Sequence, residues 1–529
     1  MALLDVKDLA VSFVTRNGTN KAVDGVSFGV ELGKITAIIG ESGSGKSVAC
    51  YSLLGLIPRP PGRIDGGTAH FEGRDLLQLK ESELRKIRGR DIAMIFQDPM
   101  TCLNPYMTIG KQLMEPLIYH HKVSKQEARA RAIELLTEVG MRDPESTVDN
   151  FPHQFSGGMR QRVMIAMALI NEPKLLIADE PTTALDVTIQ AQILKLIAEL
   201  QQKRDIGVIF ISHDLAVVAD IADHIVVMKQ GKIVETGNRE GIFKNAQHPY
   251  TKKLLAAIPT DSKAVRPGTA EPLIQIRDLC TWFSQGKGVE PVKAVNKVSF
   301  DINRGEVLGL VGESGSGKST IGRSILRLVP VTSGSVTFDG VDVTALEGSD
   351  LKNMRRRMQM IFQDPFASLN PRMTVFDTLA EPLLLHGIES RKTVAQGVLK
   401  LMDDVGLARA FVRKYPHEFS GGQRQRIAIG RALATRPEFI VADEPVSALD
   451  VTIQAQILDL MQQLGREYGL TMLFVSHDLA VVRHLADRIL VLYKGEVVEQ
   501  GTGDDLFERP QQAYTRKLLT SIPGRSLLA

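Results

Sequence analysis

Short apolar runs without polar alternation recur along the chain, with amphipathic stretches between them. Such a run is typical of a strand that is buried on both faces of a mostly parallel sheet. The pattern therefore predicts an α/β fold built on mostly parallel sheets. The runs are Ile35–Ile39, Ile92–Phe96, Leu175–Ala178, Val208–Ile211, Val307–Val311, Met360–Phe362, Phe439–Ala442 and Leu473–Val475.

The stretches between the runs have helical periodicity. The aliphatic residues of the segment 187–203 repeat along one helical stripe. A further helix is expected to begin after Ser124, because Ser124 and Glu127 form a capping-box pattern, and Gly140 offers a C-terminal stop. The segment from about 106 to 150 is therefore predicted to be a helical subdomain inserted into the α/β core.

The same series of motifs occurs twice, so the chain is a duplication. The octet GESGSGKS occupies Gly40–Ser47 and Gly312–Ser319, an offset of 272 positions. FSGG, ALDVTIQAQIL and SHDLAVV each recur at an offset of 264. The change in offset places the insertions and deletions between the octets and the FSGG motifs. We predict two homologous domains, residues 1–259 and 273–529.

The segment 260–272, TDSKAVRPGTAEP, is predicted to be the linker between these domains. It is polar and is punctuated by proline and glycine. Fully extended at ~3.5 Å per residue, it could span about 45 Å. That length lets the domains face each other while keeping them at a high effective concentration.

Composition narrows the class of protein. Hydrophobic residues make up 43% of the chain, and the net charge is only +3 without a basic tract, so nucleic acid is not expected as a partner. Three scattered cysteines, Cys50, Cys102 and Cys280, suit a reducing cytoplasm. No apolar run approaches the ~18–20 residues of a membrane span, and the N-terminus lacks the order of a signal peptide. Any membrane role is expected to act through another subunit.

The repeated octet fits the phosphate-binding pattern G-x-x-x-x-G-K-[ST]. Its glycines let successive backbone N–H groups point at phosphate oxygens, the lysine reaches the β- and γ-phosphates, and the last serine ligates Mg²⁺. The chain is therefore expected to bind two nucleoside triphosphates. The predicted binding residues are Gly40, Glu41, Ser42, Gly43, Ser44, Gly45, Lys46 and Ser47, and Gly312, Glu313, Ser314, Gly315, Ser316, Gly317, Lys318 and Ser319.

An acidic pair closes one predicted strand in each half: Asp179–Glu180 and Asp443–Glu444. Beside a phosphate loop, the aspartate is expected to support Mg²⁺, and the glutamate to polarise the attacking water. The alternative is that each pair caps the following helix.

Two further polar residues follow strands in each half. Gln97 and Gln363, in the string IFQDP, are predicted to contact Mg²⁺ and the attacking water without adding charge. His213 and His477, in SHD, are predicted to contact the γ-phosphate. The alternatives are an ordinary surface glutamine and a structural histidine.

FSGG opens a helix in each half and forms a second candidate anion site. A hydroxyl and free N–H groups at a helix start can bind an anion, although a plain N-cap is the alternative. Since each half already has a phosphate loop, this nest is predicted to serve the nucleotide of the other half. Its residues are Ser156, Gly157, Gly158 and Met159 in the first half, and Ser420, Gly421, Gly422 and Gln423 in the second.

Taken in order, these motifs resemble those of the ATP-binding cassette (ABC) ATPases over essentially the whole chain, twice. The resemblance implies a head-to-tail sandwich of cassettes that holds two ATP molecules. Each ATP would lie between one phosphate loop and the FSGG motif of the other cassette. It also implies that Phe13 and Phe283 stack on adenine. Met159 departs from the glutamine usual at that position, so the two sites are not expected to be fully equivalent.

Four longer sequence strings point to one subfamily of these ATPases. IFQDPMTCLNP and IFQDPFASLNP, with the ends HPYTKKLLAAIP and AYTRKLLTSIP, resemble dipeptide, oligopeptide and nickel importer ATPases. Length and fusion most resemble an oligopeptide/microcin C importer subunit, with a glutathione-type importer close behind. The resemblance implies two integral-membrane permease subunits and an external substrate-binding protein as partners. It also implies a peripheral location on the cytoplasmic face of the bacterial inner membrane.

Three alternatives stay open. A duplicated-cassette translation factor shares the ATP motifs but carries a long charged linker, unlike this chain. A DNA-repair cassette ATPase would need zinc-binding cysteine pairs, which three isolated cysteines do not supply. An exporter is disfavoured by the strings shared with peptide importers. The chain itself is expected to be monomeric, with an internal pair of cassettes.

Overall fold

The computed structural model describes residues 2–15, 18–98, 102–183, 185–258, 271–286, 288–447 and 449–524. The chain divides into two compact units, built mainly from residues 2–258 and 271–522. Each unit contains one six-stranded sheet, one four-stranded sheet and a group of helices. The prediction of two α/β domains is confirmed.

In the first unit, the six-stranded sheet has the order β10-β9-β3-β8-β7-β6, parallel except for β10 at one edge. The four-stranded sheet, β2-β1-β4-β5, is antiparallel. The strands are β1 (Ala2–Thr15), β2 (Gly18–Glu31), β3 (Ile35–Ile39), β4 (Gly62–Phe71), β5 (Arg74–Asp75), β6 (Ile92–Ile95), β7 (Leu175–Asp179), β8 (Gly207–Ser212), β9 (His224–Lys229) and β10 (Lys232–Asn238).

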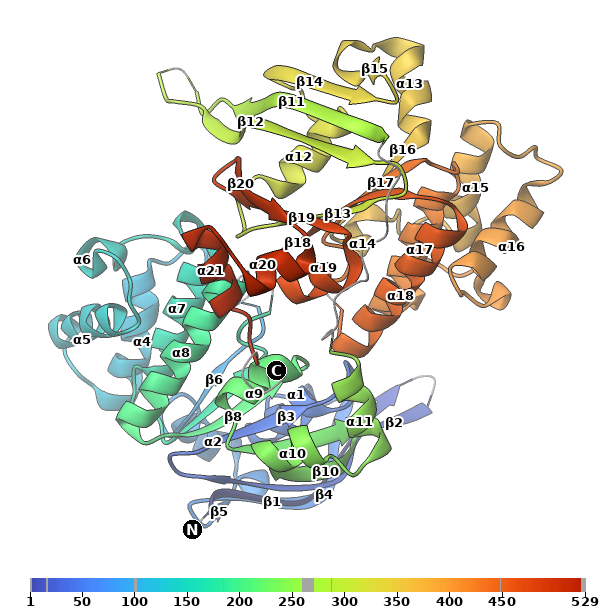
Figure 1. Ribbon diagram of the computed structural model, residues 1–529. Coiled ribbons are helices and arrows are strands. Elements are labelled where there is room, and N and C mark those ends of the chain that lie inside the picture. The colour runs from blue at the N-terminus through green and yellow to red at the C-terminus, as the bar shows by residue number, and fades with distance from the viewer. Residues whose placement is uncertain are drawn as a thin grey trace. The chain divides into compact units, whose positions relative to one another are not determined.

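The helices of the first unit include the predicted inserted group. Figure 1 shows α4, α5 and α6 grouped apart from the antiparallel sheet of the same unit. The helices are α1 (Lys46–Leu53), α2 (Glu81–Ile87), α4 (Ile109–His121), α5 (Lys125–Glu138), α6 (Pro144–Thr147), α7 (Gly157–Leu169), α8 (Val187–Arg204), α9 (Leu215–Ile221), α10 (Arg239–Asn245) and α11 (Pro249–Ala256), with 3-10 turns η1 (Leu76–Gln78) and η2 (Pro152–Gln154).

The second unit repeats this architecture, with sheets ordered β16-β17-β18-β13-β19-β20 and β12-β11-β14-β15. Its strands are β11 (Pro272–Phe283), β12 (Val292–Asn303), β13 (Val307–Val311), β14 (Ser333–Phe338), β15 (Val341–Asp342), β16 (Met358–Ile361), β17 (Phe439–Asp443), β18 (Thr471–Ser476), β19 (Arg488–Tyr493) and β20 (Glu496–Gly501). Its helices are α12 (Lys318–Ile325), α13 (Gly348–Arg357), α14 (Pro365–Ser368), α15 (Val375–Leu385), α16 (Val394–Asp404), α17 (Gly421–Leu433), α18 (Val451–Glu467), α19 (Leu479–Leu485), α20 (Gly503–Glu508) and α21 (Ala513–Thr520), with 3-10 turns η3 (Val343–Ala345), η4 (Arg409–Phe411) and η5 (Pro416–Glu418).

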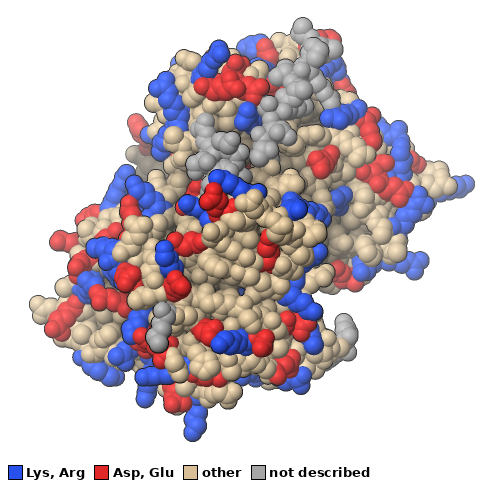
Figure 2. Space-filling view, turned by 60° about the horizontal axis from the view of Figure 1, so that its bottom comes forward, with Lys and Arg blue, Asp and Glu red and all other residues tan. Residues whose placement is uncertain are grey.

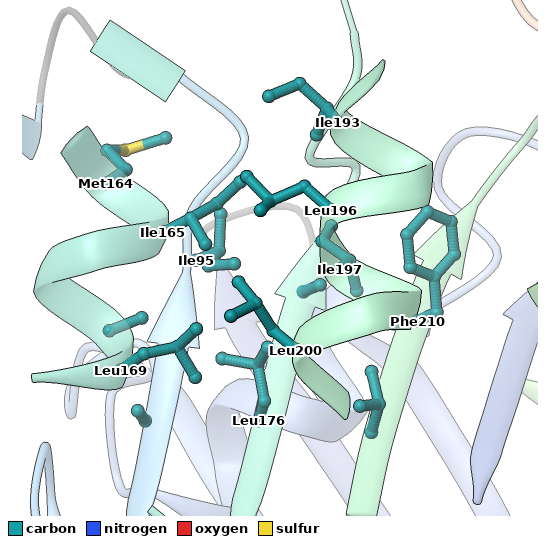
Figure 3. Packing of buried hydrophobic residues seen from close by; sticks show 14 of the residues in the cluster. Ile95, Met164, Ile165, Leu169, Leu176, Ile193, Leu196, Ile197, Leu200 and Phe210 are labelled. Atoms are coloured by element: carbon teal, nitrogen blue, oxygen red, sulfur yellow. The ribbon is translucent and has the colours of Figure 1, made fainter. Parts of the chain in front are cut away.

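The six-stranded sheet is buried on both faces, as the continuous apolar runs predict. In β3, Ile35, Ala37 and Ile39 join one hydrophobic cluster, whereas Ile38 joins the cluster on the opposite face. Figure 3 shows the first of these clusters, in which α7 and α8 pack against the sheet. Among its labelled residues are Ile165, Leu169, Leu176, Ile197, Leu200 and Phe210. Burial of the sheet fixes the strand ends at which the polar motifs lie.

Local signals read from the sequence reappear in the inserted helices. Ser124 Oγ accepts a hydrogen bond from the Glu127 N–H, and a Glu127 carboxylate oxygen accepts one from the Ser124 N–H. Gly140 has φ +74° directly after α5, the left-handed conformation that favours glycine at a helix end. Both features of that prediction are confirmed.

The four-stranded antiparallel sheets were not predicted from the sequence. Strand β1 alternates irregularly between buried and exposed residues, and its pairing with β2 shifts register four times. Such a strand has neither an uninterrupted apolar run nor a clean period of two. Strand β11 also begins at Pro272, which the sequence analysis assigned to the linker. Most of that linker, residues 260–270, lies outside the described residues.

Within the described residues, no helix is both long enough and apolar enough to cross a membrane. On the face shown in Figure 2, basic and acidic side chains are interspersed.

Candidate functional site

Each phosphate loop connects a buried strand to a helix. In the first unit, the loop follows β3 and leads into α1. Gly40 and Gly45 have φ values of +150° and +99°, and a Cβ atom on either would lie 2.2–2.3 Å from a backbone oxygen. A Cβ atom on Gly312 or Gly317 would likewise lie 2.3 or 2.1 Å from a backbone oxygen. Only glycine fits these positions, so the sequence pattern fixes the curl of the loop.

The loop lysines are buried and bonded to their own loops. Lys46 Nζ donates to the carbonyl oxygens of Gly40 and Glu41, at 2.7 and 3.0 Å. Lys318 Nζ makes the corresponding bonds at 2.7 and 2.9 Å, and burial lowers its pKa. The charged amino group of each lysine is therefore held within its phosphate loop.

Each loop also carries a buried serine hydroxyl. Ser44 Oγ and Ser316 Oγ have no hydrogen-bond partner among the described residues. A buried hydroxyl without a hydrogen-bond partner is unfavourable. A phosphate oxygen would supply the missing partner, so the loops fit an anionic ligand.

The loop serine and the strand-ending aspartate lie together in both units. Ser47 Oγ donates to Asp179 Oδ1 at 2.9 Å, and Ser319 Oγ donates to Asp443 Oδ1 at 2.7 Å. Burial raises the pKa of both aspartates, against the lowering effect of these bonds. A hydroxyl and a carboxylate are the hard oxygen ligands that Mg²⁺ prefers.

The described residues contain no group of three or more His, Cys, Asp or Glu side chains placed to hold a metal ion. A complete protein cage is not required for Mg²⁺, which usually keeps several waters and uses one or two carboxylates together with substrate phosphates. The serine–aspartate pair therefore fits Mg²⁺ bound jointly with a nucleotide.

Glu180 lies at the centre of a polar cluster immediately after β7. Gln97 Nε2 donates to its carboxylate at 2.9 Å, Thr183 Oγ1 donates at 3.1 Å, and His213 Nδ1 lies 3.1 Å away. Burial favours the neutral carboxyl, but the hydrogen bond and charge of His213 outweigh it and lower the pKa of Glu180. Burial likewise opposes the charged imidazole, yet Glu180 raises the pKa of His213. The carboxylate is thus kept ionised.

The second unit builds the same cluster around Glu444. Gln363 Nε2 donates to the carboxylate at 2.9 Å, and His477 Nδ1 lies 3.2 Å away. The pKa of Glu444 is lowered by His477 despite burial, and the pKa of His477 is raised by Glu444 despite burial. The structure therefore brings the predicted glutamine, glutamate and histidine together in both halves.

The FSGG motifs begin helices, as predicted. Ser156 caps α7 and Ser420 caps α17, each accepting a backbone N–H three residues ahead at 3.4 Å. Gln423 returns a second bond by accepting the N–H of Ser420 at 3.2 Å. Met159 cannot accept a comparable hydrogen bond and instead packs against the hydrophobic core. Methionine at position 159 therefore keeps the hydrogen bond by which Ser156 caps the helix. Only the reciprocal bond, which Gln423 makes in the second unit, is missing.

The two aromatic candidates lie in corresponding antiparallel strands. Phe13 is in β1 and is partly buried against the core, whereas Phe283 ends β11 with 42% of its surface exposed. The exposed ring of Phe283 is available for stacking. A role with adenine stays a prediction for both residues.

Two further pairs of equivalent residues lie around the phosphate loops and were not predicted from the sequence. They are Tyr51 with Arg323, and Tyr250 with Tyr514. Tyr51 Oη donates to Asp179 Oδ2 at 2.8 Å, whereas the corresponding Arg323 lies 3.7 Å from Asp443. Their spacing of four residues from the loop serine places them on the same helix face, a signal present in the sequence. Tyr250 Oη and Tyr514 Oη accept the N–H groups of Glu41 and Glu313, at 3.1 and 3.0 Å. No local sequence pattern predicts the contacts of Tyr250 and Tyr514 with the loops.

Comparison with known families agrees with this arrangement. The profile described as "ABC transporter" matches residues 23–183 and 295–447. The profile described as "Oligopeptide/dipeptide transporter, C-terminal region" matches residues 234–284 and 498–525. Each profile thus matches twice, which agrees with the duplication read from the motifs, although the first match of the second profile runs across the predicted linker to residue 284.

Curated relatives match over nearly the whole chain. The glutathione import ATP-binding protein GsiA of Pectobacterium atrosepticum is 47% identical, with 98% of this chain and 89% of the relative covered. The protein of the same name from Escherichia coli strain K12 is 46% identical with the same coverage. These relatives are of the glutathione type, which the sequence analysis placed close behind the microcin C type. They give no support to the translation-factor alternative. The chain therefore belongs to the ABC transporter family and is an ATP-binding, ATP-hydrolysing protein with two cassettes.

Proposed function

We propose that this chain energises a membrane importer for peptides or peptide-like compounds. The observation that carries the proposal is the match to the C-terminal region of oligopeptide/dipeptide transporters after each cassette. The relatives named as glutathione import ATP-binding proteins support a small peptide cargo. Glutathione is accordingly the first cargo to test.

In this proposal, Glu180 and Glu444 orient or deprotonate the water that attacks the γ-phosphate. Gln97 and Gln363 hold these carboxylates through hydrogen bonds of 2.9 Å. His213 and His477 use Nδ1 for the glutamate, so their Nε2 atoms can contact the γ-phosphate. Lys46 and Lys318 exchange their loop carbonyls for the β- and γ-phosphates when nucleotide binds.

Mg²⁺ would be held in the first cassette by Ser47 and Asp179, and in the second by Ser319 and Asp443. The amide oxygens of Gln97 and Gln363 are further candidate ligands. When bound, the ion neutralises charge on the phosphates as the γ-phosphoryl group is transferred to water.

Each ATP would be shared between cassettes. The first would meet the loop Gly40–Ser47 and the motif Ser420–Gln423. The second would meet the loop Gly312–Ser319 and the motif Ser156–Met159. Phe13 and Phe283 would stack on the adenine rings. Support comes from the exposed serine caps, whose helix N-termini suit an anion.

The proposed partners are two integral-membrane permease subunits and a substrate-binding protein outside the membrane. The chain would lie on the cytoplasmic face of the bacterial inner membrane and touch the bilayer only through the permeases. It would bind no nucleic acid.

The test is to purify the full chain from membranes in mild detergent and identify the proteins that accompany it. Two permease subunits are expected, and the reconstituted assembly should import glutathione or short peptides in an ATP-dependent manner. Recovery with ribosomes instead would overturn the proposal. Recovery with permeases but export of cargo would overturn its direction.

A further inference from the structure

The helices that follow the two phosphate loops differ at one equivalent position. In α1 this position is Tyr51, and in α12 it is Arg323. Each residue lies four positions after the loop serine, Ser47 or Ser319, and so projects from the same side of its helix. Both side chains reach the strand-ending aspartate that the serine contacts.

In the first cassette, neutral donors occupy both oxygens of the aspartate. Ser47 Oγ donates to Asp179 Oδ1 at 2.9 Å, and Tyr51 Oη donates to Oδ2 at 2.8 Å. The hydroxyl of Tyr51 carries no charge while it donates this hydrogen bond. The ring of Phe96 packs edge-on against the ring of Tyr51, with 6.2 Å between the ring centroids, and helps to hold Tyr51 in place. No positive charge is added to the serine–aspartate pair by this position.

In the second cassette, one oxygen of the aspartate lies beside a charge instead of a hydrogen-bond donor. Ser319 Oγ donates to Asp443 Oδ1, but the buried Oδ2 receives no hydrogen bond from any described residue. The Arg323 guanidinium lies 3.7 Å from that oxygen. Asp443 is fully buried while Arg323 is half exposed, so the attraction is only partly screened by solvent.

A positive charge beside the serine–aspartate pair has opposite effects on the two components of a metal–nucleotide complex. It repels a divalent cation that approaches the same oxygens, and it attracts the phosphates of the nucleotide. Tyr51 has neither effect. Both consequences follow from the charge and do not depend on the detailed geometry of the bound complex.

We propose that the two nucleotide sites differ in their requirement for the metal ion. The site built on Lys46 and Tyr51 binds the divalent cation more tightly. The site built on Lys318 and Arg323 binds it more weakly and retains nucleotide better when the metal is withdrawn. The inference rests on the proposed joint binding of Mg²⁺ and nucleotide, and it makes position 51/323 the source of the difference.

The experiment measures metal binding without turnover. The full chain is saturated with the non-hydrolysable analogue AMP-PNP and titrated with Mn²⁺, and free Mn²⁺ is read by electron paramagnetic resonance. Two classes of site are expected, with affinities that differ by at least about threefold from one charge at this range. Arg323→Tyr should raise the weaker class to the stronger. Tyr51→Arg should lower the stronger class.

Three controls separate charge from shape. Arg323→Lys keeps the charge and should keep two classes. Arg323→Gln removes the charge with little change in volume at a half-exposed position, and should act like Arg323→Tyr. Arg391→Gln removes an exposed charge outside the site and should leave both affinities unchanged. Nucleotide retention in excess chelator, measured on the same variants, should fall in Arg323→Gln and not in Arg391→Gln.

A single class of Mn²⁺ site in the wild-type chain would overturn the inference. So would two classes that persist unchanged in both Arg323→Tyr and Arg323→Gln. Failure to bind AMP-PNP and Mn²⁺ at all would instead overturn the proposed joint binding of metal and nucleotide.

Discussion

At the scale of single residues, both catalytic candidates adopt a backbone conformation that glutamate disfavours. Glu180 has φ +47° and Glu444 has φ +45°. A non-glycine residue in this region costs about 1–3 kcal/mol and persists only when its surroundings enforce it. The enforcing contacts include backbone hydrogen bonds from Glu180 to Ile211 and from Glu444 to Val475. The same conformation recurs in both cassettes, as it also does at Asp8 and Asp278, so it belongs to the duplicated fold.

Glu180→Gln and Glu444→Gln are each expected to lower ATP turnover at their own site while retaining ATP. A positioned base typically contributes ~10²–10⁴-fold to the rate. The amide keeps the size of the side chain and removes a charge that repels the γ-phosphate, so ATP stays bound. Single-turnover hydrolysis and bound nucleotide are measured for each variant. If Glu444→Gln has little effect while Glu180→Gln abolishes turnover, only one site works.

Lys46→Ala and Lys318→Ala are each expected to weaken ATP binding, because each removes the positive charge held within its phosphate loop. Equilibrium binding of a fluorescent ATP analogue provides the measurement. The matched control is Lys195→Ala, which removes an exposed lysine of α8 and should leave binding unchanged. Unaltered binding in one loop variant would show that its lysine does not contact the phosphates.

At the scale of elements, the C-terminal helix of each unit is tied to its phosphate loop. Tyr250, in α11, accepts the N–H of Glu41, and Tyr514, in α21, accepts the N–H of Glu313. Each helix is in turn anchored to the preceding strand, because Glu235 accepts the N–H groups of Gln247 and His248. Glu499 repeats this anchor in the second unit. The region matched by the oligopeptide/dipeptide profile thus supports the nucleotide loop directly.

Tyr250→Phe and Tyr514→Phe are expected to weaken ATP binding by several-fold. Loss of the hydroxyl leaves a loop N–H without its acceptor, at a cost of about 1 kcal/mol. Isothermal titration with AMP-PNP measures the affinity. Tyr106→Phe, at a tyrosine that is 91% exposed, is the matched control. Equal affinities in all three variants would contradict a positioning role for the tyrosines.

The sequence predicted the parts of the fold that have a simple periodic signature. The run Ile35–Ile39 coincides with β3, and the stripe of the segment 187–203 coincides with α8, which ends one residue later. It also predicted which polar residues end the strands, so Glu180, Gln97 and His213 could be named in advance. The antiparallel sheets escaped because β1 has an irregular pattern. The contact between Tyr250 and the loop escaped because 209 positions separate the partners.

At the scale of the whole molecule, duplication places two complete sets of candidate catalytic residues on one chain. Two sets on separate chains would have to meet by diffusion, whereas a tether replaces that encounter with a high effective concentration. The sets are not identical. Met159 stands at the position equivalent to Gln423, and Tyr51 at the position equivalent to Arg323, so fusion also fixes one copy of each version in every molecule. A chain that pairs only with itself keeps that asymmetry.

The isolated chain is therefore expected to be monomeric in the presence of ATP, with its two cassettes paired internally. The variant that combines Glu180→Gln with Glu444→Gln should trap ATP, because it binds nucleotide without turnover. Light scattering of that variant should report the mass of one chain, 58.1 kDa, with and without ATP. An internal pair should also form at a rate independent of protein concentration, because its partners are tethered. A two-chain species that requires ATP, and whose formation accelerates with protein concentration, would show that the cassettes pair between molecules.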